Sequence, residues 1–196
     1  IKSMVLFSYR EMRLENKIAI ITGGASGIGG ATSKLFCKEG AKVAILDINE
    51  KAGHEIVSEI NLNGGEAIFF KTDVSKSAEV SKSIKAVIKE FNKIDILFNH
   101  AGTIIVKPLH KSTEDDYDRL MDINVRSAFL TCSKVIPHML ENGGGSIVIT
   151  SSIGGEKGFA YESLYCMTKG AVLQLARSIA VEYRDNNIRC NAVCPA

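Results

Sequence analysis

One glycine-rich stretch, Thr22 to Gly29, constrains the fold more than any other part of the sequence. It follows an isoleucine-rich run over residues 17–21, which predicts a buried strand, and it precedes a helical pattern over residues 30–38. Glycines at such a turn allow positive φ angles and leave no Cβ in the way of a phosphate, which the helix dipole attracts. The stretch lacks the Gly-Lys-Ser/Thr ending of nucleotide-hydrolase loops. It therefore predicts a phosphate-binding turn, and a plain strand-to-helix turn remains the alternative because the chain contains 17 glycines.

Length and composition limit the classes of protein to which the chain can belong. Its 196 residues suit one domain with a sizeable core, and a net charge of +2 without a basic run gives no reason to expect nucleic acid as a partner. No apolar stretch approaches the roughly 18 residues of a membrane span, and no signal-peptide pattern is present, so no membrane partner is expected. Five cysteines without paired spacing and four dispersed histidines favour a cytoplasmic protein with neither disulfides nor a metal site.

Strand and helix patterns alternate along the whole chain, and this alternation is typical of a parallel sheet covered by helices. The predicted fold class is α/β: a Rossmann-type doubly wound parallel sheet with at least six strands, helices on both faces and a single domain. That domain is expected over residues 12–196, and residues 1–11 are expected to form an extension that is partly disordered or derived from cloning. The predicted strands cover residues 17–21, 42–46, 67–70, 94–98, 146–150 and 188–193.

Two long helices are predicted in the second half of the chain. Ser112, with Asp115 three residues later, resembles a capping box for a helix that runs to about Glu141. Pro137 is expected to kink this helix or to end it early. The second long helix is predicted from Ser163 to about Asp185.

Asp47 follows the second predicted strand, eighteen residues after Gly29. A carboxylate there can accept hydrogen bonds from the ribose of an adenosine, or it can simply cap the next helix. A 2′-phosphate about 4 Å away would be repelled by a few kcal/mol at an effective dielectric near 20. No Arg or Lys stands directly beside Asp47, and Lys51 is the nearest cation in the sequence, so NAD is favoured over NADP.

Tyr165 and Lys169 are four residues apart on a predicted helix, so their side chains share one face. A free tyrosine has a pKa of about 10, and a general base near neutral pH needs this pKa lowered by about three units. An adjacent ammonium group and a cationic nicotinamide can supply that stabilisation. Ser152, at the end of the fifth predicted strand, can hydrogen-bond the same substrate oxygen, and Ser151 is the competing candidate. Taken alone, however, a Tyr and a Lys at this spacing often occur by chance.

Other polar residues have both a functional and a structural interpretation. Asn99 ends the fourth predicted strand, and the small residues Ala101 and Gly102 can form a floor for a cofactor ring, although a plain turn explains them equally well. Asp73 either faces an adenine ring or caps a helix. Asn124, inside the first long helix, is otherwise a surface polar residue.

Together these motifs resemble the classical short-chain dehydrogenase/reductases from about Met12 to the end of the chain. In that family a tyrosine is the catalytic acid/base, and a lysine binds the nicotinamide ribose and lowers the tyrosine pKa. A serine orients the substrate oxygen, and an asparagine helps to hold a chain of proton-relaying waters. The resemblance implies these roles for Tyr165, Lys169, Ser152 and Asn124. The matching motifs, in the family's order, are Thr22-Gly23-x-x-x-Gly27-x-Gly29, Asp73-Val74, Asn99-x-Ala101-Gly102, Asn124, Ser152 and Tyr165-x-x-x-Lys169.

The resemblance also implies how the cofactor binds and how subunits associate. It implies that Asp47 selects NAD and that Asp73 and Val74 contact adenine. The two long helices commonly form a four-helix interface in this family, so a homodimer or homotetramer is expected, although core burial alone explains many of their apolar residues. The residues expected to bind the dinucleotide are Gly23, Ser26, Gly27, Ile28, Gly29, Asp47, Ile48, Asp73, Val74, Asn99, Ala101, Gly102, Tyr165 and Lys169.

Two departures from the family pattern stand out. His100 replaces the usual asparagine; an imidazole is about as large and can donate a hydrogen bond, so little loss is expected, but its titration can add a pH dependence. The family also continues well beyond a Pro-Gly, whereas Pro195 is followed by Ala196. We expect either a longer protein or a truncation that binds NAD without closing over substrate, in which the sixth strand is an unpaired apolar edge prone to aggregation.

The function expected from the sequence is that of an NAD(H)-dependent oxidoreductase that interconverts a secondary alcohol and a ketone, with Tyr165 as general acid/base. Two alternatives remain: an NADP-dependent 3-oxoacyl reductase, and a dinucleotide-binding fragment without catalysis. The substrate is expected to be a small-molecule alcohol or ketone. Apolar residues between Gly154 and Leu164 favour a partly apolar pocket for it.

Overall fold

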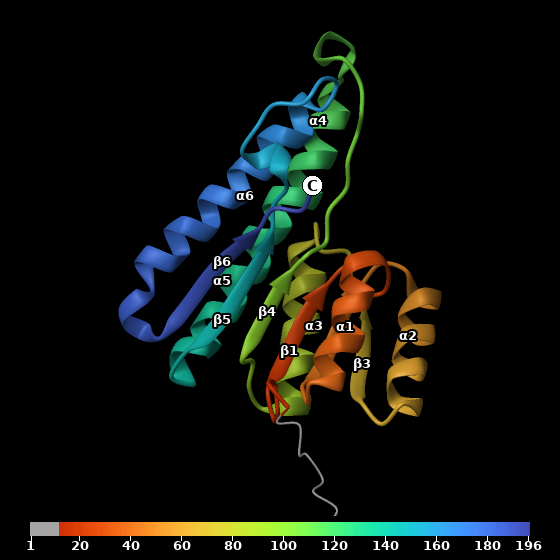
Figure 1. The fold of residues 1–196 in the computed structure, drawn as a ribbon, viewed down its shortest axis with the longest axis vertical. Helices are drawn as coiled ribbons and strands as arrows, with labels where there is room; N and C mark the ends of the chain where they lie inside the picture. Colours follow the sequence, from red (N-terminus) through yellow and green to blue (C-terminus); the bar gives the residue numbers. More distant parts are fainter. Residues whose placement is uncertain (1–11) are drawn as a thin grey trace, which may run out of the picture.

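The computed structural model describes residues 12–196, which form one six-stranded parallel sheet flanked by helices (Figure 1). The strand order is β3-β2-β1-β4-β5-β6, so the predicted doubly wound α/β fold is confirmed. The extension predicted over residues 1–11 lies outside the described residues. The strands are β1 (Ile18–Thr22), β2 (Lys42–Asp47), β3 (Glu66–Lys71), β4 (Ile96–Asn99), β5 (Gly145–Thr150) and β6 (Ile188–Val193). The main helices are α1 (Gly27–Lys38), α2 (Glu50–Leu62), α3 (Ser77–Phe91), α4 (Glu114–Leu120), α5 (Ser127–Glu141) and α6 (Ser163–Glu182).

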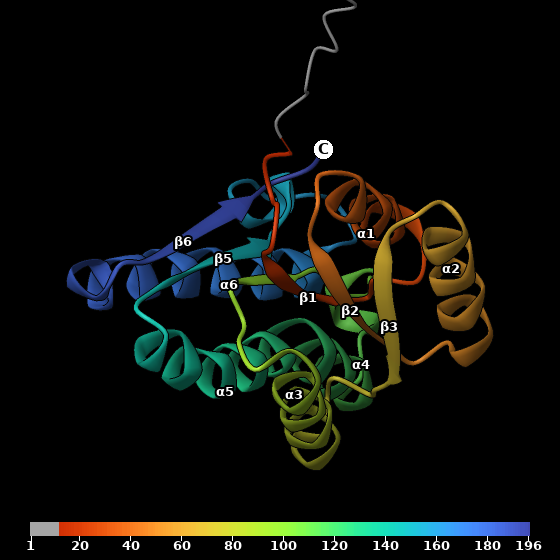
Figure 2. The same cartoon turned by 90° about the horizontal axis from the view of Figure 1, so that it is seen from below.

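The sheet has a hydrophobic core on each face, and β1 contributes side chains to both cores. Ile18 and Ile20 belong to the larger core, which also contains residues of α3, α5 and α6, whereas Ala19 and Ile21 belong to the smaller core with residues of α1 and α2. Figure 2 shows α3 and α5 on one side of the sheet and α1 on the other. All five residues of β1 are buried, as expected for a central strand of a parallel sheet that is covered on both faces.

The strand order reverses at β1, and this reversal sets the place of the binding site. β1 pairs with β2 on one side and with β4 on the other, so Thr22 lies opposite both Leu46 and Asn99. The turns that leave these three strands therefore meet at the same edge of the sheet. In open α/β sheets, ligands bind in the crevice at this switch point.

Residue types along the chain explain several local features of the helices. Asn49, a residue type favoured at helix N-caps, caps α2 by accepting a hydrogen bond from the backbone N–H of Ala52 at 3.1 Å. Val80, Ile84 and Val87 have the spacing of one helix face and are buried along α3. The second long helix begins at Ser163 as expected, but it ends at Glu182, a few residues early.

The capping box predicted at Ser112 and Asp115 is wrong by one residue. Thr113 is the N-cap of α4: its hydroxyl accepts the N–H of Asp116 at 3.2 Å, and the Asp116 carboxylate accepts the N–H of Thr113 at 2.9 Å. The Ser112 hydroxyl instead donates to the carbonyl of Pro108. Both pairs have the spacing of a capping box, and the turn before the helix decides between them.

The helix that follows is not continuous. A π-helical segment, Met121–Arg126, separates α4 from α5, and nothing in the apolar pattern predicts it. The early end expected at Pro137 is wrong, because α5 includes Pro137 and continues to Glu141. Val135, Ile136 and Met139 are buried around the proline, and this burial offsets the lost backbone hydrogen bond.

Strand β6 is an edge strand among the described residues, as expected. It is not apolar along its length, however, because the exposed residues Arg189 and Asn191 alternate with the buried residues Ile188 and Cys190. Within residues 12–196, no helix combines the length and apolar character needed to cross a membrane. All five cysteines are free thiols.

Candidate active site

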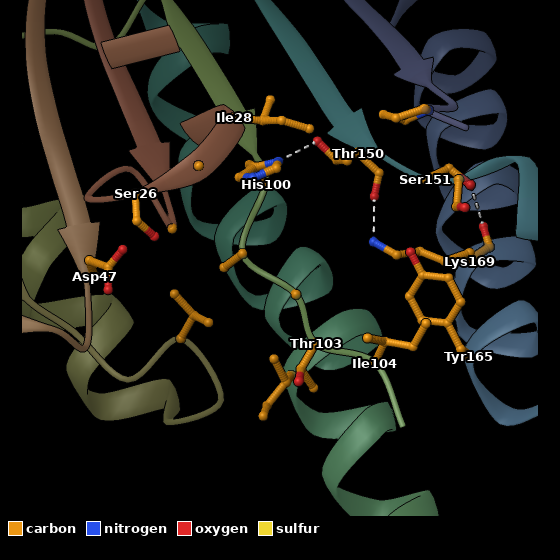
Figure 3. Close-up of a pocket in the computed structure, with 18 of the residues that line it drawn as sticks. Ser26, Ile28, Asp47, His100, Thr103, Ile104, Thr150, Ser151, Tyr165 and Lys169 are labelled. Carbon is orange, nitrogen blue, oxygen red and sulfur yellow. Dashed lines mark hydrogen bonds between the residues drawn. The ribbon is translucent and has the colours of Figure 1, made fainter. Parts of the chain in front are cut away.

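The turns after the strands enclose one pocket of about 770 Å³ at the carboxyl edge of the sheet. Its volume lies within the range of roughly 300–1,000 Å³ that small-molecule sites occupy. Figure 3 shows Ser26 and Asp47 on one side of this pocket and Tyr165 and Lys169 on the other, with His100 between them. Residues from both halves of the sheet thus meet in one cavity.

Three of the glycines between β1 and the first turn of α1 shape this turn in different ways. Gly23 has a φ of +65°, and a Cβ there would lie 2.9 Å from the Cα atom of Ala101. A Cβ on Gly29 would collide with the carbonyl oxygen of Gly23. Gly27 has a φ of +53°, and a Cβ there would meet nothing within 4 Å. The first two glycines therefore close the turn, and Gly27 leaves its pocket side open.

The beginning of α1 fits an anion. Ser26 is the N-cap residue, but its hydroxyl makes no capping hydrogen bond and lines the pocket. The first N–H groups of any helix lack partners within the helix, and the helix dipole adds a positive partial charge there. Gly27 and Ile28 line the same wall. These groups provide donors and open space for a dinucleotide diphosphate, so the residues present fit that group.

Asp47 is both a pocket residue and a brace for the glycine turn. Its Oδ2 atom accepts the N–H of Ala25 at 3.1 Å, and its Oδ1 atom accepts the N–H of Asn49 at 2.9 Å. Each oxygen keeps a lone pair on the pocket side, where ribose hydroxyls can donate. Ile48 beside it is 64% exposed and also lines the pocket.

Asp73 and Val74 line the pocket beyond β3. The Oδ1 atom of Asp73 accepts hydrogen bonds from the backbone N–H and the hydroxyl of Ser75, at 3.0 and 2.6 Å. Val74 is buried. Asp73 therefore has the structural turn role as well as a position in the pocket, so the two interpretations of this residue are compatible.

His100 lies in the middle of the pocket wall. Its Nδ1 atom is 3.0 Å from the Thr150 hydroxyl, and its ring stacks on Phe98 with centroids 5.3 Å apart. Burial and, secondly, the positive charge of Lys169 lower the pKa of His100 below the usual 6.5. The imidazole is therefore neutral near pH 7, and any pH dependence that its titration adds falls below pH 6.5.

Tyr165 and Lys169 lie together on the first turns of α6 (Figure 3). The Lys169 Nζ atom is 5.6 Å from the centroid of the tyrosine ring and donates to the carbonyl of Thr150 at 2.9 Å. Lys169 is only 5% exposed, and burial lowers its pKa to about 8. The Tyr165 hydroxyl has no hydrogen bond within residues 12–196, so it is available to a ligand.

The structure distinguishes the two serines after β5. Ser151 is 1% exposed, and its hydroxyl donates to the carbonyl of Lys169 at 2.8 Å. Ser152 accepts the N–H of Gly154 at 3.1 Å, and its hydroxyl hydrogen has no acceptor in the described part of the chain. Both residues line the pocket, but only Ser152 has a hydrogen left to donate to a ligand.

Three predicted site residues, Gly29, Asn99 and Asn124, do not line the pocket. The amide of Asn99 donates to the carbonyl of Ala128 and to Cys132 Sγ, and its oxygen accepts from Thr131. This side chain therefore joins β4 to α5 inside the core rather than facing a cofactor. Of its small neighbours, Ala101 and Gly102 do line the pocket.

Asn124 lies behind the pocket in the π-helical segment and is buried, so it is not the surface residue of the structural alternative. Its Oδ1 atom accepts the N–H of Thr103 at 2.8 Å, and its Nδ2 atom donates to the carbonyl of Thr103 and the hydroxyl of Thr168. A Cβ on Gly102 would lie 3.3 Å from Asn124 Oδ1 and 3.4 Å from Lys169 Nζ. Asn124 thus lies close to the lysine without reaching the pocket.

Sequence reasoning missed three residues that organise the site. Thr22 accepts the N–H groups of His100 and Ala101 with one hydroxyl, and Thr150 contacts both His100 and Lys169. Glu162 lines the pocket directly before α6. The positions of Thr22 and Thr150 as the last residues of neighbouring parallel strands were a usable signal. The only signal in the sequence that Glu162 belongs to the site is its spacing of three residues from Tyr165.

The chain is similar to known proteins both in sequence and in structure. The family model described as short chain dehydrogenase matches residues 17–196. An uncharacterized oxidoreductase of Thermotoga maritima is 42% identical over 94% of this chain and 72% of its own length. Cyclopentanol dehydrogenase of Comamonas sp. is 37% identical over 93% of this chain and 73% of its own length. A solved structure of 7 alpha-hydroxysteroid dehydrogenase, complexed with NADH and 7-oxo glycochenodeoxycholic acid, has a TM-score of 0.91 and 35% identity, covering 95% of this chain and 72% of that one.

A parallel sheet with a pocket at its switch point is the architecture of many nucleotide-binding proteins. The comparisons narrow this class, since the family model covers nearly all the described residues. The chain belongs to the short-chain dehydrogenase/reductase family, as its motifs predicted. It is accordingly an NAD(P)-dependent oxidoreductase that acts on CH–OH groups.

Replacing Lys169 by Met tests the buried charge. The pKa of Lys169 is about 8 in the folded protein and 10.5 without burial, so the unfolded chain binds more protons between these two values. The contribution of Lys169 to the free energy of unfolding is therefore lowest below pH 8 and rises up to pH 10.5. Urea unfolding measures the free energy of unfolding of both proteins across this pH window. The difference, wild type minus Lys169→Met, is expected to rise by about 3 kcal/mol from pH 8 to pH 10.5.

The matched control for this experiment is Lys157→Met, because Lys157 is an exposed lysine near the same site. Its difference from wild type is expected to stay constant with pH. A constant difference for Lys169→Met as well would contradict the buried ammonium.

Proposed function

We propose that this protein is an NAD(H)-dependent oxidoreductase that interconverts a secondary alcohol and a ketone. The observation that carries the proposal is the position of Tyr165 and Lys169 at one end of a pocket whose other end holds the glycine turn and Asp47. One dinucleotide can thus reach both groups. The cyclopentanol dehydrogenase and hydroxysteroid dehydrogenase among the similar proteins support an alcohol as substrate.

Named residues would hold each part of the dinucleotide. The first turn of α1 and Ser26 would bind the diphosphate, Asp47 the adenosine ribose, and Asp73 and Val74 the adenine end. Lys169 would bind the nicotinamide ribose. When bound, the nicotinamide supplies the acceptor or donor for the hydride.

Proton transfer is the part of the reaction that we assign to Tyr165. In the oxidising direction the deprotonated phenol oxygen of Tyr165 accepts the proton of the substrate alcohol, and Ser152 donates a hydrogen bond that orients the substrate oxygen. The ammonium of Lys169 stabilises the negative charge on the phenol oxygen, and its own position is fixed by the carbonyl of Thr150. Ketone reduction uses the same groups in reverse.

Asn124 is proposed to support the proton path from behind the pocket. It fixes the turn at Thr103 against Thr168 of α6, and it lies next to Lys169 across Gly102. Both of its amide hydrogens are used, so a relay water would bind at the remaining lone pair of its oxygen or at a nearby backbone carbonyl. π-Helical turns often free such carbonyls at functional sites.

NAD rather than NADP is proposed because, within residues 12–196, no Lys or Arg pairs with Asp47 and could neutralise a 2′-phosphate there. Lys51 is 87% exposed at its side chain and pairs with Glu55 at 3.9 Å, and Lys71 pairs with Glu50. A 2′-phosphate would therefore meet the uncompensated carboxylate of Asp47. The alternative, an NADP-dependent 3-oxoacyl reductase, requires the opposite preference.

Asp47→Asn is the variant that tests this preference. The amide keeps an oxygen that can accept the N–H of Ala25 but removes the charge that repels a 2′-phosphate. The ratio of NADPH to NADH dissociation constants is expected to fall at least tenfold, because the repulsion is worth more than about 1.4 kcal/mol. Fluorescence titrations of both nucleotides give the ratio. Wild-type protein that binds NADPH more tightly than NADH would contradict the proposal.

Tyr165→Phe tests the mechanism. Loss of the phenol oxygen is expected to lower kcat for cyclopentanol oxidation by at least about 100-fold, because general acid–base catalysis contributes that much. The dissociation constant for NADH should change less than about twofold. The control is Tyr183→Phe, at the far end of the same helix, which should retain full activity.

Undiminished turnover by Tyr165→Phe would refute the assignment of the proton-transfer group. Tight NADH binding by wild-type protein that turns over no alcohol or ketone would instead favour the third possibility, a dinucleotide-binding protein without catalysis. The two results are therefore separable in one set of assays.

We also propose how the subunits associate and in which compartment the protein works. Phe129 of α5 and Met167 and Val181 of α6 are 58%, 43% and 67% exposed, which supports a homodimer or homotetramer that covers these helices. Free thiols at all five cysteines support a reducing compartment such as the cytoplasm.

A further inference from the structure

One acidic side chain of the pocket is not used by cofactor binding or proton transfer. Glu162 lines the pocket directly before α6 and is half-buried, and its carboxylate has no hydrogen bond or ion pair within residues 12–196. Its backbone carbonyl accepts the N–H of Cys166, so the chain is already helical in its bonding here. Residues three apart on a helix have Cβ atoms roughly 5–6 Å apart. Glu162 therefore stands about one helical turn from Tyr165.

The two other acidic side chains of the pocket belong to the cofactor end. Asp47 ends β2 and Asp73 follows β3, and these strands lie in the half of the sheet opposite to β6 (Figure 1). Glu162 is therefore the only acidic side chain on the Tyr165 side among the described lining residues. The side chains that share this side with it are mostly apolar: Ile104, Ile123, Ile153 and Phe159.

An unpaired carboxylate beside apolar walls has a consequence when substrate enters. The substrate displaces water from Glu162, and a carboxylate left without a donor in a dry site is strongly unfavourable. A substrate that supplies a hydrogen-bond donor at this point avoids that loss. A substrate that lacks a donor there binds less tightly, because it leaves the carboxylate of Glu162 without a partner. Glu162 therefore discriminates between substrates with and without a donor at this point.

The charge of the site selects the kind of donor. A cationic amine would approach the buried ammonium of Lys169 and, during alcohol oxidation, the cationic ring of the oxidised cofactor. An anionic substrate would be repelled by Glu162 itself. A second hydroxyl donates to the carboxylate without adding a charge, so a neutral donor is favoured over both.

We propose that Glu162 is a specificity-determining residue that accepts a hydrogen bond from a second hydroxyl of the substrate. The preferred substrate class is a neutral diol with an apolar carbon skeleton, in which one hydroxyl reacts at Tyr165 and the other binds Glu162 about a helical turn away. This inference rests on the proposed alcohol oxidation, since it concerns the substrate of the same site.

The test compares cyclohexanol with the 1,2-, 1,3- and 1,4-cyclohexanediols, with NAD as cofactor. Wild-type protein is expected to show a kcat/KM for its best diol about tenfold or more above that for cyclohexanol, as one hydrogen bond to a charged group provides. Glu162→Ala should remove this preference and raise kcat/KM for cyclohexanol, because the variant has no carboxylate that cyclohexanol would leave without a donor. Glu162→Gln keeps an acceptor without the charge and should fall between them.

Glu156→Ala is the matched control. Glu156 is an exposed carboxylate six residues earlier on the same segment, it has no partner among the described residues, and it does not line the pocket. Its diol preference should equal that of wild type. An unchanged preference in Glu162→Ala, or an equal loss of diol and cyclohexanol activity, would overturn the inference, because the second result shows a merely structural role.

Calorimetry of diol binding to the NADH-loaded protein is run in parallel. It tests the role of Glu162 separately from the proposed alcohol oxidation. Diol binding that depends on Glu162 without turnover would contradict the proposed alcohol oxidation alone. Turnover of cyclohexanol and diols without any dependence on Glu162 would contradict the diol inference alone.

Discussion

The site depends on the contact between the turn after β1 and the turn after β4. Thr22 is 1% exposed, and its hydroxyl accepts the N–H groups of His100 at 3.0 Å and Ala101 at 3.1 Å. This one oxygen joins two strands that are neighbours in the sheet but far apart in the sequence. Gly23 allows the close approach, because a Cβ there would press on Ala101. The glycine turn after β1 and the pocket wall at His100 and Ala101 are thereby held in one fixed relation.

The electrostatics of the pocket follow from the same arrangement. Lys169 is a buried cation whose Nζ atom is fixed by the carbonyl of Thr150, while the hydroxyl of Thr150 contacts His100. A charged imidazole there would place a second cation near the first. The lowered pKa of His100 avoids this, which explains how a histidine occupies a place where the family usually has a neutral asparagine. The positive charge therefore stays at Lys169, beside Tyr165.

The sequence predicts those parts of the structure that depend on neighbours along the chain. The glycine turn, the cap at Asn49 and the shared face of Tyr165 and Lys169 follow from local spacing, and all three are present. The boundary between Ser112 and Thr113 failed because both have an acidic residue three positions later, and only the preceding turn decides between them.

Other features depend on contacts that a sequence does not display. Asn99 ends the predicted strand, but its side chain faces α5 rather than the pocket. Asn124 is held by Thr103 and Thr168, in a π-helical segment that the apolar pattern does not reveal. Glu162 gains significance only when the fold places it on the same wall as Tyr165.

A crystal structure of the protein with bound NADH tests the central claim most directly, namely that one dinucleotide spans the pocket from Asp47 to Tyr165. The expected density has the diphosphate at the first turn of α1, the adenosine ribose at Asp47 and the nicotinamide beside Tyr165 and Lys169. A nicotinamide that lies outside the pocket, or an adenine that occupies the Tyr165 end, would contradict the claim.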